Sequence, residues 1–206
     1  MEPSALREWT WQEPANPDAA IALIAHAFAS DPFYRWLFPR ASEPRRAAAL
    51  ERFFRALARG RRLRVTMDGA RCLVAALDEP WHARPRWTTA LRAGPALAWA
   101  LAVGSWPRPW RLVTAARLLA ALGRLRPKTP HLHLALVAVA PEARGTGLGK
   151  AAVEALIAES GGALHLETSR PENRGFYARL GMVETASVAR GAAPPVWVYL
   201  SGVAPR

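Results

Sequence analysis

The sequence predicts an α/β domain in which a mixed sheet lies between helices on both faces. Short apolar runs of strand length alternate with longer segments whose apolar residues recur at helical spacing. An Asp68-Gly69 pair separates two of the short runs, as expected for an antiparallel hairpin. Another short run leads into a glycine-rich turn and then a helical pattern, all within 134–150. Together these patterns indicate a three-layer fold, with one domain spanning 1–206.

The first half of the chain contains a strand, two helices and the hairpin. Residues 5–12 alternate loosely between polar and apolar, which indicates a strand. Asn16-Pro17 is a typical helix start, and this helix should run to about Ser30, where Asp31-Pro32 ends it. The remaining elements are an amphipathic helix at 44–59, and hairpin strands at 62–67 and 70–77.

The second half is helical first and then alternates between strand and helix. From 87 to 125 the pattern turns helical twice, with a break at the proline-rich 106–109. This helical insertion occupies 81–128 and precedes a strand at 132–139. The elements that follow are a helix at 147–160, a strand at 163–168, a short helix at 172–180, and strands at 182–190 and 196–201.

Composition argues against several classes of protein. Apolar residues make up 51% of the 206, so the chain can bury a core rather than stay disordered. Its net charge of +12 comes from scattered arginines rather than one stripe with aromatic residues, so nucleic-acid binding is not expected as the main role. The longest apolar stretch, 93–106, contains Pro95 and Gly104 and is too short to span a bilayer. A lone Cys72 and an N-terminus without signal-peptide features predict a cytoplasmic location. No metal or membrane partner is predicted, and a monomer and a homodimer both fit.

The glycine-rich turn has the features of a diphosphate site. Its glycines leave backbone N–H groups uncovered, and the first turn of the following helix adds free amides and positive partial charge. The third glycine comes one residue too early for a dinucleotide fingerprint, and Ala151 stands where a P-loop has Ser or Thr. A glycine-rich turn without a ligand is the structural alternative. The predicted diphosphate-binding residues are Arg144, Gly145, Thr146, Gly147, Leu148, Gly149 and Lys150.

Two tracts of the sequence resemble known acetyltransferases. Arg144-x-x-Gly147-x-Gly149, after a Val-x-Val-x-Pro strand exit, resembles the acetyl-coenzyme A loop of the GNAT superfamily of N-acetyltransferases. A Leu-Glu-Thr-Ser run at 166–169, then Asn173 and a Phe-Tyr-x-Arg-Leu-Gly run at 176–181, resemble the puromycin N-acetyltransferase family. The resemblance is tight over 126–183 and looser elsewhere. It implies a GNAT-like, mostly antiparallel mixed sheet, with the insertion covering the acceptor side.

The resemblance also implies direct transfer of an acetyl group from acetyl-coenzyme A to an amine in a ternary complex. Tyr177 would protonate the departing thiolate, and Glu167 would accept the amine proton. Backbone groups of 137–139 and the side chain of Asn173 would contact the cofactor arm beyond the diphosphate. The residues implied for the arm are Val137, Ala138, Val139 and Asn173.

The general base stays open at this point. Many superfamily members place a glutamate on the strand at 132–139, and this chain has none there. The alternatives are Glu167, His131, His133 or a water molecule, and the two histidines share one face of the strand. Simple packing is the alternative role for Tyr177, and an ion pair with an arginine is the alternative for Glu167. The residues predicted to contact the acceptor are Phe33, Tyr34, Trp87 and His133.

The expected activity is acetyl-coenzyme A-dependent acetylation of a primary amine on a small molecule. Antibiotic-like amines are among the candidates, which would make the protein a resistance enzyme. The insertion at 81–128 favours a small acceptor, because a protein acetyltransferase usually needs an open groove there. The competing predictions are a protein N-acetyltransferase and a non-catalytic acyl-coenzyme A-binding sensor or interaction module.

Overall fold

The computed structural model of the chain describes residues 17–58, 64–68, 72–78 and 110–202. The predicted strand at 5–12, the first part of the helical insertion and Trp87 lie outside these ranges. The described residues form a sheet of six strands in the order β1-β2-β3-β4-β6-β5. Only β3 and β4 run parallel, and the other neighbouring pairs are antiparallel. The strands are β1 (Arg64–Asp68), β2 (Cys72–Asp78), β3 (Leu132–Val139), β4 (Leu164–Thr168), β5 (Val183–Val188) and β6 (Val196–Leu200).

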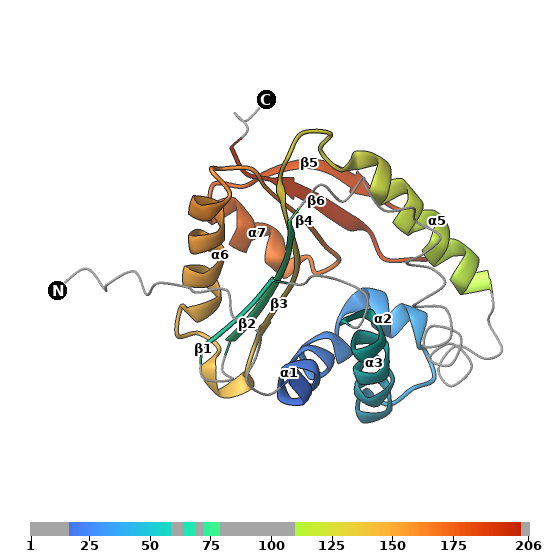
Figure 1. Cartoon of the computed structure of the whole chain (residues 1–206). Helices are drawn as coiled ribbons and strands as arrows, with labels where there is room; N and C mark the ends of the chain where they lie inside the picture. Colours follow the sequence, from blue (N-terminus) through green and yellow to red (C-terminus); the bar gives the residue numbers. More distant parts are fainter. Residues whose placement is uncertain (1–16, 59–63, 69–71, 79–109, 203–206) are drawn as a thin grey trace.

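Helices cover both faces of this sheet (Figure 1). One face packs against α6 and α7, while α1, α2, α3 and α5 lie on the other. This arrangement confirms the predicted α/β class with a mixed, mostly antiparallel sheet. Among the described residues, no helix combines the length and hydropathy needed to cross a bilayer. The helices are α1 (Pro17–Ala29), α2 (Pro32–Leu37), α3 (Glu43–Ala58), α5 (Trp110–Leu125), α6 (Leu148–Glu159) and α7 (Glu172–Arg179), and a short 3-10 turn spans Pro141–Ala143.

The core follows from the alternation of side chains along the central strands. Leu164 and Leu166 point toward α6 and α7, where Val153 of α6 is fully buried against them. On the opposite face, α5 buries Leu118 against Val198 of β6. Each such side chain contributes roughly 1.5–3 kcal/mol by leaving water, so both layers hold the sheet in place.

One helix was not expected from the sequence. The Asp31-Pro32 pair was predicted to end a helix, and α1 does end at Ala29. However, Asp31 also begins α2: its carboxylate accepts a hydrogen bond from the Phe33 N–H at 2.9 Å, and Pro32 takes the first helical position. A proline fits that position because the N–H it lacks has no partner there in any helix.

The strand β3 contains a bulge that changes the face of the sheet to which its later side chains point. Its register with β2 shifts so that Ala135 has no opposite residue. Leu134 therefore faces α6 and α7, whereas Leu136 faces α1. The parallel ladder with β4 ends at the pair Leu134 and Leu166. Beyond that pair the two strands part, as expected where a bulge bends one strand of a sheet.

Candidate active site

A cavity of about 510 Å³ lies where β3 and β4 part. It reaches both layers of helices, since α7 contributes to one end and α1, α2 and α5 to the other. Eight of the residues predicted for the site line it. They are Phe33, Tyr34, Val137, Val139, Arg144, Glu167, Asn173 and Tyr177.

The glycine-rich turn lies at the end of the cavity where β3 finishes. Gly145 and Gly147 have φ of +78° and +86°, a conformation that costs little only for glycine. Gly147 is the N-cap of α6 and offers no side-chain hydrogen bond to the first-turn amides. Those amides therefore keep their free N–H groups, and the helix dipole adds positive partial charge. The turn is built to accept an anion on its backbone.

Close packing joins the turn to the strand. A Cβ added to Gly149 would lie 3.2 Å from Cγ2 of Val139, so the turn and the strand are closely packed at this position. The Arg144 guanidinium donates from Nε to the Val139 carbonyl at 3.4 Å. The Thr146 hydroxyl donates to the Ala143 carbonyl at 2.7 Å, which fixes the turn. Leu148 and Lys150 belong to the first turn of α6.

Three of the four predicted cofactor-arm residues line the cavity. Val137 and Val139 line the cavity from β3, whereas Ala138 between them is buried toward α1. Asn173 lines it from α7 and donates from Nδ2 to the Thr168 hydroxyl at 3.1 Å. An extended ligand arm entering from the turn would pass between these walls.

Tyr177 lines the cavity from α7, the helix that also carries Asn173. Its side chain is 7% exposed, and its ring packs against Tyr199 with centroids 5.5 Å apart. Burial raises the pKa of Tyr177 to about 12, with a smaller contribution from Tyr199. The phenol is therefore protonated at neutral pH and can act only as a donor of its proton.

Glu167 lies across the cavity on β4, on the face covered by α5. Its Oε1 is 3.6 Å from Nε of Arg126, which follows α5 directly, and its Oε2 is 3.2 Å from Nε2 of His133. Burial raises the pKa of the Glu167 carboxyl, and the Arg126 charge opposes that rise. A partly buried carboxylate with a raised pKa is a suitable general base.

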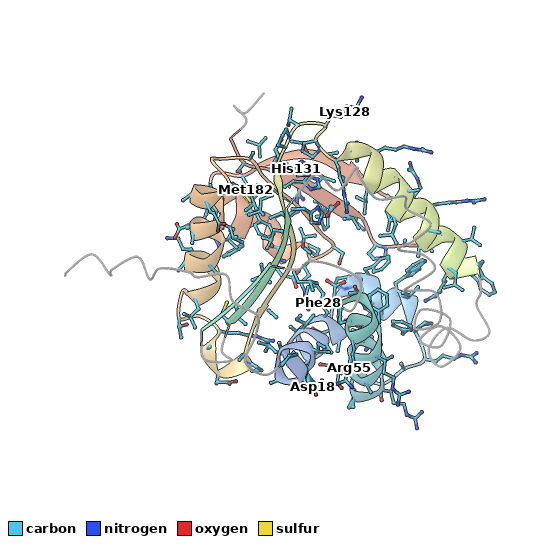
Figure 2. All side chains as sticks on the ribbon, viewed as in Figure 1. Asp18, Phe28, Arg55, Lys128, His131 and Met182 are labelled. Carbon is cyan, nitrogen blue, oxygen red and sulfur yellow. The ribbon has the colours of Figure 1, made fainter. Side chains whose placement is uncertain are left out.

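Three histidines stand behind Glu167 rather than in the cavity wall. His133 was predicted to contact the acceptor; instead it lies next to His165, with the two Nδ1 atoms 3.2 Å apart. His131 packs edge-on against His165 and bonds through Nδ1 to the Thr129 carbonyl at 2.8 Å. Figure 2 shows His131 at the end of the sheet where β3 begins, below the loop that carries Lys128. The sequence signal for His165 was its two-residue spacing from Glu167, which puts both on one face of β4.

The same cluster has the spacing of a metal site. Ligand atoms of His133, His165 and Glu167 all lie within 4.8 Å of one another. The Arg126 guanidinium, however, already provides a positive charge to the Glu167 carboxylate. A divalent cation at this position would face that charge at close range, so the donor set does not favour one.

A second buried carboxylate fixes the corner of α1 and α2 to the end of β4. The Asp31 Oδ1 accepts hydrogen bonds from the Ser169 hydroxyl at 2.7 Å and from the Phe33 N–H, and Oδ2 is 3.5 Å from Nε of Arg170. Arg170 also donates to the Ala27 carbonyl at 3.0 Å. Burial raises the pKa of Asp31, and these partners oppose that rise. Sequence reasoning missed this network because its members are 138 residues apart.

The end of the cavity next to Glu167 is aromatic and apolar. Phe33 and Tyr34 of α2 line it, and their rings meet edge to face at 5.4 Å. Phe28 of α1 also lines it, and Figure 2 shows this side chain between α1 and the sheet. Three leucines of α5 complete the wall. They are Leu118, Leu119 and Leu122.

Comparison with known proteins gives one family and several related folds. A sequence model of the Acetyltransferase (GNAT) family matches residues 30–182. A solved structure described as histone acetyltransferase HPA2 and related acetyltransferase from Corynebacterium glutamicum is 21% identical, and the match covers 93% of this chain and 96% of that one with a TM-score of 0.56. Arylalkylamine N-acetyltransferase 2 from Aedes aegypti is 10% identical, with 93% and 97% covered and a TM-score of 0.58. The C-terminal condensation domain of Ebony in complex with beta-alanyl-dopamine is 14% identical, with 87% and 91% covered and a TM-score of 0.54.

Proposed function

The chain belongs to the GNAT acetyltransferase family, and from that premise we propose that it acetylates a primary amine of a small molecule with acetyl-coenzyme A. The observation that carries the small-molecule assignment is the cavity. It is continuous from the anion-binding turn to an aromatic end that α5 covers. Tyr177 and Glu167, the residues proposed for catalysis, line this same cavity.

The turn and the parted strands support the binding of coenzyme A. The diphosphate is assigned to the backbone amides from Arg144 to Lys150, where the two positive-φ glycines keep the approach open. The pantetheine arm is assigned to the gap between β3 and β4. There, Val137 and Val139 of β3 and Asn173 of α7 line the cavity. A backbone N–H of β3 aimed at the thioester carbonyl would stabilise the developing oxyanion.

Tyr177 is assigned as the proton donor to the departing thiolate. The reaction breaks the C–S bond, forms the C–N bond, and leaves a sulfur that needs one proton. A phenol with a pKa of about 12 is a weaker acid than a free tyrosine, whose pKa is about 10. The burial that raises this pKa also raises the basicity of a thiolate released beside it, so the transfer becomes less uphill.

Glu167 is assigned as the acceptor of the amine proton. A primary aliphatic amine with a pKa near 10.4 is almost fully protonated at neutral pH, and its deprotonation costs roughly 4–5 kcal/mol. A carboxylate at the cavity wall accepts this proton before the nitrogen attacks the thioester carbon, and such general-base help is typically worth about 10²–10⁴ in rate. The raised pKa of Glu167 brings its basicity closer to that of the amine.

The acceptor end favours a small amine with an apolar or aromatic body. Phe28, Phe33 and Tyr34 provide the aromatic surface, and Glu167 provides the carboxylate that is proposed to accept the amine proton. The names of the related structures include both a histone acetyltransferase and an arylalkylamine acetyltransferase, so they do not choose between acceptors. The cover that α5 gives to this end argues for the small molecule. Puromycin is one candidate, because the tract 166–181 resembles that family.

The experiment is a coenzyme A release assay against a panel of amines. The panel contains puromycin, arylalkylamines, aliphatic polyamines and peptides with free N-termini. We expect turnover with one or more small amines and no turnover with peptides. Turnover restricted to peptides would overturn the small-molecule assignment. Binding of acetyl-coenzyme A without acetylation of any panel member, or of a pooled amine library read by mass spectrometry, would overturn the enzymatic one.

A further inference from the structure

Behind the cavity wall, a line of hydrogen-bonding groups runs from Glu167 into the protein. The Oε2 atom of Glu167 lies 3.2 Å from Nε2 of His133, and Nδ1 of His133 lies 3.2 Å from Nδ1 of His165. The two histidines are directly opposite each other in the parallel ladder of β3 and β4, so they project from the same face. Both rings are buried, with 4% and 1% exposed.

From this geometry we infer that His165 and His133 are positioning residues for Glu167: His165 fixes the tautomer of His133, and His133 holds the carboxylate oriented and charged. The inference rests on the proposed role of Glu167 as the base. Its new content is the assignment of the two buried histidines.

The direction of the hydrogen bonds follows from what each group can donate. An ionised carboxylate only accepts, so Nε2 of His133 carries the proton that bonds to Glu167. A neutral imidazole protonated on Nε2 has a bare Nδ1, and that atom needs a donor. His165 supplies it from its own Nδ1–H. Burial and the charges of His131 and Arg126 lower the pKa of His165 to about 3, so this ring is neutral and has only one proton to place.

The remaining polar atoms agree with this assignment. With its proton on Nδ1, His165 keeps only a lone pair on Nε2, and that atom has no hydrogen-bond partner among the described residues. A bare lone pair in an apolar setting costs less than a buried positive charge. Oε1 of Glu167 is also buried, and it faces Nε of Arg126 at 3.6 Å.

Within 17–58 and 110–202, two other titratable groups face this line of side chains. Arg126 faces Glu167 from the end of α5, and His131 faces His165 from the start of β3. Opposite them, β6 places Val198 beside Glu167 and Leu200 beside His165 in the antiparallel ladder. Arg126 and His131 are therefore the groups to control for in a test of pH dependence.

The first test reads the tautomers directly and needs no acceptor. Protein labelled with ¹⁵N-histidine, freed of metal with EDTA, is examined by NMR at neutral pH. We expect the proton of His165 on Nδ1 and that of His133 on Nε2. A proton on Nε2 of His165 would overturn the inference, even if the enzyme proves active. A histidine spectrum that EDTA changes would also overturn it, because a metal ion would then occupy the cluster.

The second test measures the pH dependence of kcat with one amine from the panel. Removing the donor to Glu167 makes its charged form less favourable, so the acid limb should move to higher pH. For His133→Phe we expect a shift of about one to two pH units, and for His165→Phe a shift in the same direction. His165→Asn keeps an N–H at nearly the place of Nδ1 and should restore the wild-type limb. His131→Phe, a buried ring on the same face that packs edge-on against His165, is the matched control for the position of the limb.

The outcomes of the second test separate the possibilities. A limb that stays in place in His133→Phe, or that moves equally in the His131→Phe control, would contradict the positioning role. If no panel amine is acetylated, the proposed function is wrong. The NMR measurement still shows whether His165 donates to His133 and His133 donates to Glu167.

Discussion

The buried neutral state of His165 predicts a specific loss of stability in acid. The ring is 1% exposed, and its pKa falls from the usual 6.5 to about 3 because of burial, aided by the charges of His131 and Arg126. Between these two values the unfolded chain holds a proton on this residue and the folded chain does not. Stability from this residue is therefore present above about pH 6.5 and is lost as the pH falls toward 3.

The size of the loss follows from the linkage. A pH of about 4.5 is roughly two units below the pKa of the histidine in the unfolded chain. His165 therefore lowers the free energy of unfolding by about 2.7 kcal/mol relative to neutral pH. For a chain of this length that corresponds to a fall in Tm of roughly 5–10 °C. Every other group that titrates also contributes, so the prediction concerns the difference between wild type and His165→Phe. The free energy of unfolding of the variant, minus that of wild type, should rise by about 2–3 kcal/mol when the pH falls from about 7.5 to about 4.5.

Urea unfolding followed by tryptophan fluorescence at the two pH values measures this difference. The added bulk of the phenyl ring acts about equally at both pH values and cancels. The loss of the bond to His133 also raises the pKa of Glu167, and the same measurement on His133→Phe corrects for that contribution. His26→Phe, at an exposed position on α1, is the control and should show a flat difference. A wild type and a His165→Phe variant that lose stability in parallel on acidification would refute the buried neutral histidine.

Four further substitutions test separate parts of the structure. Tyr177→Phe should lower kcat by about 10² or more with little change in acetyl-coenzyme A affinity, and an unchanged kcat would reduce Tyr177 to a packing residue. Gly147→Ala should cost about 1–2 kcal/mol of stability, because φ is +86° there, and weaken coenzyme A binding about tenfold or more in calorimetry. Gly161→Ala, with φ of +61° at the other end of α6, should cost similar stability without loss of binding, and equal losses of binding in both would count against the turn. Asp31→Ala should lower the free energy of unfolding by about 1–3 kcal/mol, since α2 loses its cap and Arg170 loses a partner; a change below the error of chemical denaturation would contradict that network.

Most elements of the fold were predicted from local features of the sequence. The strand at 132–139 and the helix beginning at 147 were predicted within a residue of β3 and α6, because apolar alternation and glycine punctuation are local properties. The helix α2 was missed because Asp31-Pro32 is equally compatible with a helix end and a helix start. Only the contact of Asp31 with Ser169, far along the chain, shows how the corner is held.

The site was predictable to the extent that it depends on sequence-adjacent residues. The turn from Arg144 to Lys150 is one such unit. The bulge at Ala135 depends on the pairing of β3 with β2, and no residue type within β3 predicts it. The hydrogen bonds of Glu167 with His133 depend on the register of two strands separated by a whole helix. Register is set by tertiary packing, which alternation along a single strand does not encode.

The central claim is that backbone amides from Arg144 to Lys150 bind the diphosphate of coenzyme A, and amide hydrogen exchange tests it most directly. The purified protein is exchanged with and without acetyl-coenzyme A, and with Gly147→Ala as the weakened comparison. We predict protection concentrated in 144–150 and in the free edge of β3 beyond Leu134, reduced in the variant at the same ligand concentration. Absence of protection there at millimolar acetyl-coenzyme A, or protection confined to another part of the chain, would contradict the account.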